Sequence, residues 1–173
     1  MKKQQYVDLV VRYAESVWDS LYENQTTDVQ VVYLEEYKGE EKLHYKHEGD
    51  SGFDLSAAID KPITLEPFER RIIPSGVKMA CPEGTEIQVR PRSGTAYKKG
   101  ITVANTPGTV DAGYRGEIGI IVFNISNDEV TIEPGERIAQ AVLCPVFRAN
   151  FVEVEQLDVT TRGEGAYNST GVK

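Results

Sequence analysis

The sequence has few of the side chains on which several common kinds of active site depend. Its 173 residues include two cysteines, Cys81 and Cys144, and two histidines, His44 and His47. The cysteines are too far apart for a Cys-x-x-Cys motif, and two cysteines do not make a disulfide framework. The histidines stand in a polar, charged stretch, which is typical of a solvated loop. These shortages argue against a structural zinc site and against a Ser-His-Asp or Cys-His catalytic centre.

Long hydrophobic runs and an excess of positive charge are also lacking. No apolar run approaches the roughly 20 residues of a membrane-spanning helix, and no apolar stretch follows the basic first residues, so we expect no signal peptide. Asp and Glu outnumber Lys and Arg by 27 to 19, and the resulting net charge of −8 opposes general binding to nucleic acid. Because isolated cysteines suit a reducing compartment, we expect a cytoplasmic protein that binds neither membrane nor nucleic acid.

Two hydrophobic patterns divide the chain. Apolar residues recur at spacings of three and four over residues 4–23, which predicts an amphipathic helix. From residue 29 onward, short apolar runs are separated by Gly, Pro, Asn and Asp, which is typical of an all-β sandwich or barrel. The predicted strands cover residues 29–33, 63–65, 71–73, 77–80, 86–90, 101–105, 117–123, 130–132 and 138–147.

Two further segments have their own character. Residues 118–123 are apolar almost throughout, which predicts a strand buried on both faces, as at a subunit interface. Residues 162–171 contain three glycines and no periodicity, which predicts a flexible tail.

One candidate site follows the predicted strand 86–90. Arg92 offers a planar fork for phosphate, Ser93 a hydroxyl, and Gly94 lets backbone N–H groups approach closely. The Gly-Lys-[Ser/Thr] phosphate loop of many nucleotide-binding proteins is missing, so these residues would have to bind phosphate in another way. An ordinary surface turn explains the same segment equally well.

Two more candidates lie further along the chain. Pro107-Gly108 predicts a hairpin that carries Asn105, whose amide suits reading a base, and Asp111, which suits activating a water. The tail combines phosphate ligands with an aromatic ring that can stack on a base: Arg162, Tyr167, Ser169 and Thr170. A hairpin and a tail without any ligand remain alternatives.

Taken together and in order, these segments resemble the five motifs of the trimeric dUTPase family. The resemblance covers about residues 28–173, and five motifs in order are far more specific than any one of them. The matching segments are residues 52–58, 91–94, 108–117, 135–140, and 162–165 with 169–171.

The resemblance implies a fold and an activity. The fold would be an all-β, jelly-roll-like barrel, or β-clip, that assembles as a homotrimer with each active site built from three subunits. The activity would be hydrolysis of dUTP to dUMP and pyrophosphate with Mg²⁺, which controls dUTP and supplies dUMP for dTMP synthesis. The expected organisation is a helical extension over residues 1–27, the barrel over 28–158, and a C-terminal lid over 159–173. The extension lies outside the family's usual span.

The same resemblance implies which residues would bind the nucleoside part of dUTP. Asp111 would be the base that deprotonates the attacking water, and Tyr114 would pack under the deoxyribose and exclude a 2′-hydroxyl. The uracil edge would be read by Asn105 and by the backbone of Gly108, Thr109 and Val110.

The residues that bind the phosphates of dUTP would come from other subunits. One subunit would hold phosphates with Arg92, Ser93, Gly94 and Gln140. Another would close its tail over the γ end with Arg162, Ser169 and Thr170, while Tyr167 stacks on the base. Asp54 either touches the metal's water shell or only anchors the barrel.

Two alternatives and one departure accompany this interpretation. A dCTP deaminase resembles dUTPases in fold but needs a glutamate about ten residues beyond the aspartate, where this chain has Ile121. A trimer that binds a regulatory protein through its N-terminal helix is a second alternative, and it is compatible with catalysis. The fifth motif reads Ala166-Tyr167-Asn168 where the family usually has Gly-Phe-Gly.

Overall fold

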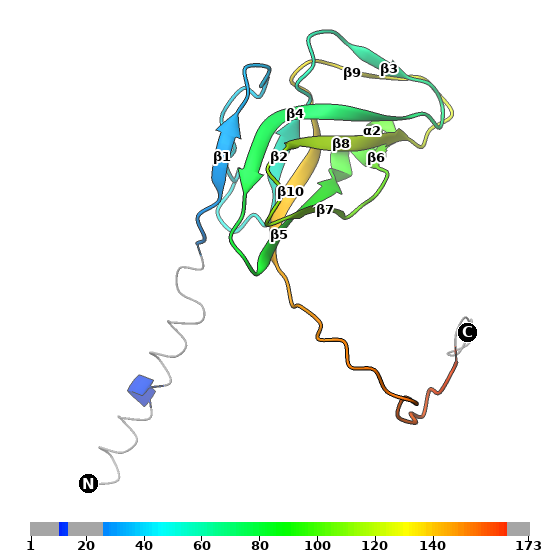
Figure 1. The fold of residues 1–173 in the computed structure, drawn as a ribbon. Coiled ribbons are helices and arrows are strands. Elements are labelled where there is room, and N and C mark those ends of the chain that lie inside the picture. The colour runs from blue at the N-terminus through cyan, green and yellow to red at the C-terminus, as the bar shows by residue number, and fades with distance from the viewer. Residues whose placement is uncertain (1–10, 14–25, 166–173) are drawn as a thin grey trace.

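The structure, a computed structural model, describes residues 11–13 and 26–165 (Figure 1). Within these residues the strands pair antiparallel as two four-stranded sheets and one two-stranded sheet, which confirms the all-β prediction. The first sheet has the order β1 (Gln30–Tyr33), β4 (Arg70–Ala80), β8 (Glu117–Asn124), β6 (Ile101–Val103). The second has the order β2 (Phe53–Ser56), β10 (Arg137–Pro145), β5 (Thr85–Pro91), β7 (Gly108–Asp111). The small sheet pairs β3 (Ile63–Leu65) with β9 (Val130–Ile132).

The hydrophobic core lies between the two larger sheets. Side chains alternate between the two faces of a strand, so every second residue of β8 points inward. Ile118, Ile120 and Val122 are almost completely buried, whereas Ile121 and Phe123 are only half-buried. Within one chain, the prediction that this strand is buried on both faces is therefore wrong.

The outward face of β8 nevertheless remains apolar. Ile121 pairs with Ile72 of β4, whose side chain is 66% exposed, and Phe123 lies beside Arg70. An exposed apolar strip of this kind is typical of a surface that another protein covers.

Three further details of the fold differ from the sequence predictions. Residues 71–73 and 77–80 belong to one bent strand, β4, whose pairing with β8 is interrupted between Pro74 and Lys78. The strands predicted on either side of the Pro107-Gly108 segment, at residues 101–105 and 117–123, do pair, as β6 with β8. Their connection is not a tight hairpin, because it contains β7, which pairs with β5 in the other sheet.

A short helix, α2 (Ser93–Lys99), stands where the sequence indicated only a turn. Seven residues are too few for a stable isolated helix, so packing must support it. Thr95 is its buried residue, and the Thr95 hydroxyl donates to the Arg137 carbonyl over 3.4 Å. The helix therefore ties residues 93 and 94 to the start of β10.

The ends of the described chain extend beyond the barrel. Residues 11–13 are helical, and the rest of the helix predicted over 4–23 lies outside the described residues. After β10, residues 146–165 leave the barrel without helix or strand (Figure 1). Over the parts of the chain that the structure covers, no helix is long and apolar enough to cross a membrane.

A strained backbone position closes the turn before β4. Phe68 has a φ of 60°, which costs a residue with a β-carbon roughly 1–2 kcal/mol, and its side chain is 62% exposed. The turn is fastened on both sides of Phe68, because the Glu69 N–H donates to the Glu66 carbonyl and the Glu66 N–H donates to the Glu69 carboxylate. The Glu66 N–H, and next Arg71, hold the pKa of Glu69 below its ordinary value.

Phe68→Gly should stabilise the protein by about 1 kcal/mol, because glycine adopts a positive φ without a β-carbon clash. Urea unfolding measures the change, with Phe68→Ala as the control that removes the same ring but keeps the β-carbon. An equal gain in both variants would show that the exposed ring, and not the backbone, is the source.

Candidate functional site

Sheet register brings three polar side chains into one row. Gln140 of β10 pairs with Asp54 of β2 on one side and with Arg90 of β5 on the other. Gln140 Nε2 donates to the Pro91 carbonyl over 2.9 Å. Its Oε1 lies so close to Gly52 that a β-carbon there would be only 2.7 Å away. The register thus unites the first, second and fourth predicted motifs, and a side chain at position 52 would displace the end of Gln140.

Asp54 binds two arginines at once. Its Oδ1 accepts from Arg92 Nε at 2.6 Å, and its Oδ2 accepts from Arg137 Nη1 at 3.1 Å. Arg92 also donates through Nη1 to the Arg137 carbonyl at 3.2 Å. The two bonds of Arg92 use its Nε and Nη1 atoms, which leaves its Nη2 group for an anion. Asp54 thus holds the two arginines together, and both roles predicted for it stay predictions.

These residues line a groove that is positively charged on an otherwise acidic chain. Its other wall is the loop over residues 37–51, and its floor includes Ser93, Gly94 and the start of α2. Eight lysine and arginine residues line the groove against six carboxylates, whereas the whole chain has a net charge of −8. A local excess of cations over an acidic background favours a phosphorylated ligand at this one place.

The groove wall also holds a neutral tyrosine. Burial raises the pKa of the Tyr37 hydroxyl above its ordinary value, and Tyr33 raises it further. The hydroxyl donates to the Glu41 carbonyl over 2.5 Å and so braces the loop. This tyrosine therefore shapes the groove without contributing charge.

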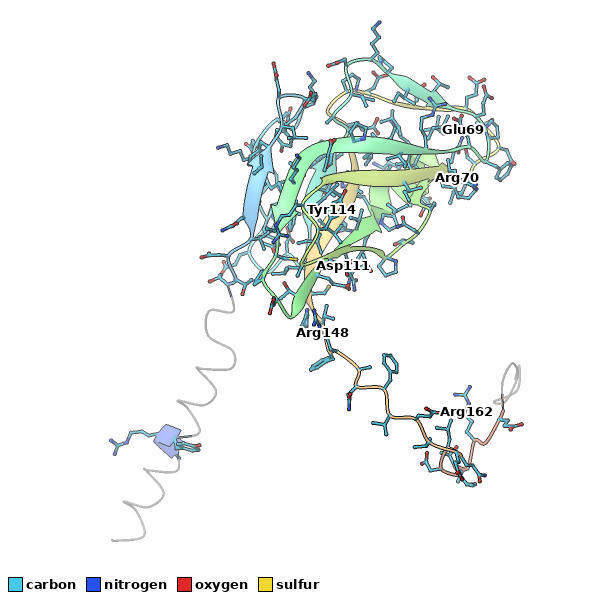
Figure 2. All side chains as sticks on the ribbon, viewed as in Figure 1. Glu69, Arg70, Asp111, Tyr114, Arg148 and Arg162 are labelled. Atoms are coloured by element: carbon cyan, nitrogen blue, oxygen red, sulfur yellow. The ribbon has the colours of Figure 1, made fainter. Side chains whose placement is uncertain are left out.

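The predicted nucleoside residues lie elsewhere, on and around β7. This strand is the edge of its sheet, so one row of its backbone N–H and C=O groups is unpaired within the described barrel. Asn105 is exposed, and its Nδ2 is 3.0 Å from where a β-carbon of Gly108 would stand. Asp111 is the last residue of β7 and lies close to Tyr114 in the turn that follows (Figure 2), and both are exposed.

Strand β5 separates Asp111 from the groove. Asp111 pairs with Glu86 near the start of β5, whereas Arg92 follows Pro91 at its end. At about 3.3 Å per residue, Glu86 and Pro91 are roughly 17 Å apart. The groove is lined neither by Asn105 nor by Asp111 or Tyr114 among the described residues. One chain therefore does not bring the predicted base and the predicted phosphate ligands together.

Of the predicted site residues in the tail, the structure describes Arg162 alone. Arg162 lies on the extended segment, away from the barrel (Figure 2), and its Nε donates to the Gly165 carbonyl over 3.1 Å. Tyr167, Ser169 and Thr170 lie outside the described residues.

Sequence reasoning missed two arginines of the groove. Arg90 lies on the same face of β5 as Gln88 and Glu86, so the alternating pattern of residues 86–90 already placed it on the polar face. Arg137 stands inside the fourth predicted motif, but its approach to Asp54 depends on a register shift between Arg137 and Ala139. Nothing in the sequence predicts that register shift.

The fold and the groove define an all-β barrel protein with a cationic groove suited to a polyphosphate. A family model described as dUTPase matches residues 40–171. The chain therefore belongs to the dUTPase family.

Relatives and solved structures agree with this assignment. The deoxyuridine 5′-triphosphate nucleotidohydrolase of Fusobacterium nucleatum is 54% identical over 143 residues, which cover 83% of this chain and 97% of that protein. The protein of the same name from Bdellovibrio bacteriovorus is 50% identical over 147 residues, covering 85% and 98%. The Staphylococcus bacteriophage 80alpha dUTPase, solved with dUPNHPP, is similar with a TM-score of 0.75 and 28% identity, covering 85% of this chain and 100% of that chain. The predicted jelly-roll-like dUTPase fold is thereby confirmed.

Proposed function

We propose that this chain hydrolyses dUTP to dUMP and pyrophosphate at an active site shared between subunits of a homotrimer. The observation that carries the proposal is the division of the motifs: the cationic groove holds the candidate phosphate ligands, whereas Asp111, the candidate base, pairs with Glu86, about 17 Å along β5 from Pro91. The family and the dUTP nucleotidohydrolases at about half identity supply the substrate.

The division itself requires a second subunit. A general base acts within hydrogen-bond reach of the proton that it removes, or through one water. Asp111 cannot meet that condition for a phosphate bound at Arg92 of its own chain. The apolar strip on β4 and β8, with Ile72 most exposed, offers surface that subunit contacts would bury.

The nucleoside would bind along the edge of β7. The backbone of Gly108, Thr109 and Val110 and the Asn105 amide can form hydrogen bonds with the uracil edge. A site whose polar groups match one base rejects another, because mismatched groups are left unpaired. Tyr114 would pack under the deoxyribose, where a 2′-hydroxyl would collide with its ring.

The triphosphate would lie in the groove of a neighbouring subunit. Arg92, Ser93 and Gly94 would contact phosphate oxygens, with Gln140 beside them, and Asp54 keeps Arg92 oriented in advance. The tail of a third subunit would cover the γ end through Arg162, Ser169 and Thr170 and stack Tyr167 on the base.

The groove also fits a magnesium ion bound mainly by substrate. Mg²⁺ keeps several waters and takes one or two carboxylates together with phosphate oxygens, and the described residues contain no cluster of three or more metal-ligating side chains. Both oxygens of Asp54 bind arginines, so Asp54 would hold the ion through water. When bound, Mg²⁺ would neutralise charge on the triphosphate.

In the reaction, Asp111 would take a proton from a water that attacks the α-phosphorus in line. The bond from the α-phosphorus to the bridging oxygen of the β-phosphate breaks, and pyrophosphate leaves. Arg92 and its neighbours would stabilise the charge that passes to the leaving group. A water nucleophile explains why the chemistry needs no reactive serine or cysteine.

Three other expectations concern deamination, the cellular location and a protein partner. Ile121 stands where a dCTP deaminase would need a proton-transferring glutamate, and it lies against Ile72 rather than at the β7 edge, which disfavours deamination. A cytoplasmic location and a protein partner for residues 1–27 stay predictions from the sequence.

The purified protein should release pyrophosphate from dUTP far faster than from dCTP, dTTP or UTP in the presence of Mg²⁺. A pyrophosphate assay over these four nucleotides, with ammonia measured in parallel, tests the proposal. Comparable rates on dUTP and UTP would remove the role of Tyr114, and ammonia released from dCTP would indicate the deaminase.

Asp111→Asn should bind dUTP nearly normally yet lose about 10²–10⁴-fold in kcat, because asparagine keeps the size but cannot accept the proton. Calorimetry with a non-hydrolysable dUTP analogue separates binding from turnover. Near wild-type turnover would exclude Asp111 as the base.

In solution the chain should have a mass about three times its own 19.3 kDa, because the active site needs residues from neighbouring subunits. Sedimentation equilibrium measures this directly. An active monomer would contradict the shared site.

A further inference from the structure

A five-residue turn connects β7 to β8 and carries Tyr114. The Tyr114 N–H donates to the Asp111 carbonyl over 3.0 Å, and Arg115 Nη1 donates to the Ala112 and Tyr114 carbonyls at 2.6 and 2.7 Å. These bonds fix the backbone of the turn. They do not by themselves fix the tyrosine ring, which is 46% exposed.

The ring is held by the last residue of the turn, Gly116, and by the first residue of β8, Glu117. The Tyr114 hydroxyl donates to the Glu117 carbonyl over 2.9 Å, so the ring folds back along its own chain. In this position the ring lies directly over Gly116. A β-carbon on Gly116 would stand 2.3 Å from the Tyr114 hydroxyl oxygen and 2.5 Å from the adjoining ring carbon. The observed ring orientation is therefore possible only with glycine at position 116.

The Glu117 side chain links the start of β8 to Gly76 of the neighbouring strand β4. Its carboxylate Oε1 accepts the Gly76 N–H over 2.8 Å, at the place where the pairing of β4 with β8 is interrupted. Gly76 has no strand partner there, so the carboxylate replaces the missing ladder bond. The carbonyl that receives the tyrosine hydroxyl thus belongs to a residue whose side chain is itself anchored.

We propose that Gly116 and Glu117 are positioning residues that set the selectivity for deoxyribose over ribose by fixing the orientation of the Tyr114 ring. This inference rests on the proposed function, in which Tyr114 excludes the 2′-hydroxyl. Neither residue touches the substrate. Gly116 leaves the space that the ring occupies, and Glu117 supplies an immobile acceptor for its hydroxyl.

Gly116→Ala tests the proposal against a matched control in the same turn. The added β-carbon must displace the ring, whereas a β-carbon on Gly113 would meet nothing within 4 Å. We expect Gly116→Ala to lower the ratio of kcat/KM for dUTP to that for UTP by about tenfold or more, since misplacement by about 1 Å can cost up to about 10²-fold. Gly113→Ala should keep the wild-type ratio. An unchanged ratio in Gly116→Ala, or equal losses on both nucleotides, would overturn the proposal.

Glu117 provides a second test that adds no bulk. Glu117→Gln retains an oxygen that can accept the Gly76 N–H, whereas Glu117→Ala removes it. The alanine variant should lose selectivity for dUTP over UTP and the glutamine variant should largely restore it. Equal selectivity in the two variants would contradict a positioning role for the carboxylate.

A crystal structure of Gly116→Ala separates this inference from the proposed function, because it requires no turnover. The inference predicts that the Tyr114 hydroxyl no longer reaches the Glu117 carbonyl. An unmoved ring would overturn the inference even if the wild-type protein hydrolyses dUTP, and failure of the wild type to hydrolyse dUTP would reject the proposed function while the ring position still decides the structural claim.

Discussion

The pairing of β5 with β7 on one edge and with β10 on the other determines where the candidate site residues of the barrel lie. Because the strands are antiparallel and in register, Gln140 stands beside Arg90 while Asp111 stands beside Glu86. Strand β5 is extended and paired on both sides, so Asp111 stays roughly 17 Å from Pro91 and the start of the phosphate-binding candidates. Under the proposed function, oligomeric assembly would then be a condition of the chemistry, since Asp111 and the candidate phosphate ligands would meet only across a subunit boundary.

The groove carries an excess of positive charge on a chain whose net charge is −8. The Asp54 carboxylate lies between Arg92 and Arg137 and holds their two charges close together. All three side chains are partly exposed, so these pairs contribute little to the stability of the fold, at most about 1 kcal/mol. Their main effect is geometric, because they hold Arg92 in place at the groove.

Much of the architecture could be predicted from the sequence, and the failures have physical causes. The strands at residues 63–65 and 130–132 were predicted with their observed bounds, because turn residues flank short β-branched runs. β2 was missed because its four residues, which include Asp54, show no long alternation. The hairpin at Pro107-Gly108 was predicted without β7 because a turn signal is local, whereas the pairing of β7 with β5 depends on the whole sheet. The candidate phosphate ligands were chosen from motif chemistry and stay predictions, whereas the contact of Arg137 with Asp54 depends on a register shift that only the fold reveals.

Subunit complementation tests the shared site most directly. Arg92→Ala and Asp111→Asn should each abolish most activity, yet each chain keeps the half of the site that the other has lost. When the two variants are dissociated, mixed in equal amounts and reassembled, random assortment should restore about a quarter of wild-type activity, since one site in four receives an intact Asp111 from one chain and an intact Arg92 from another. No recovery in mixed trimers, verified by mass spectrometry, would show that both residues act within one chain and would contradict the account.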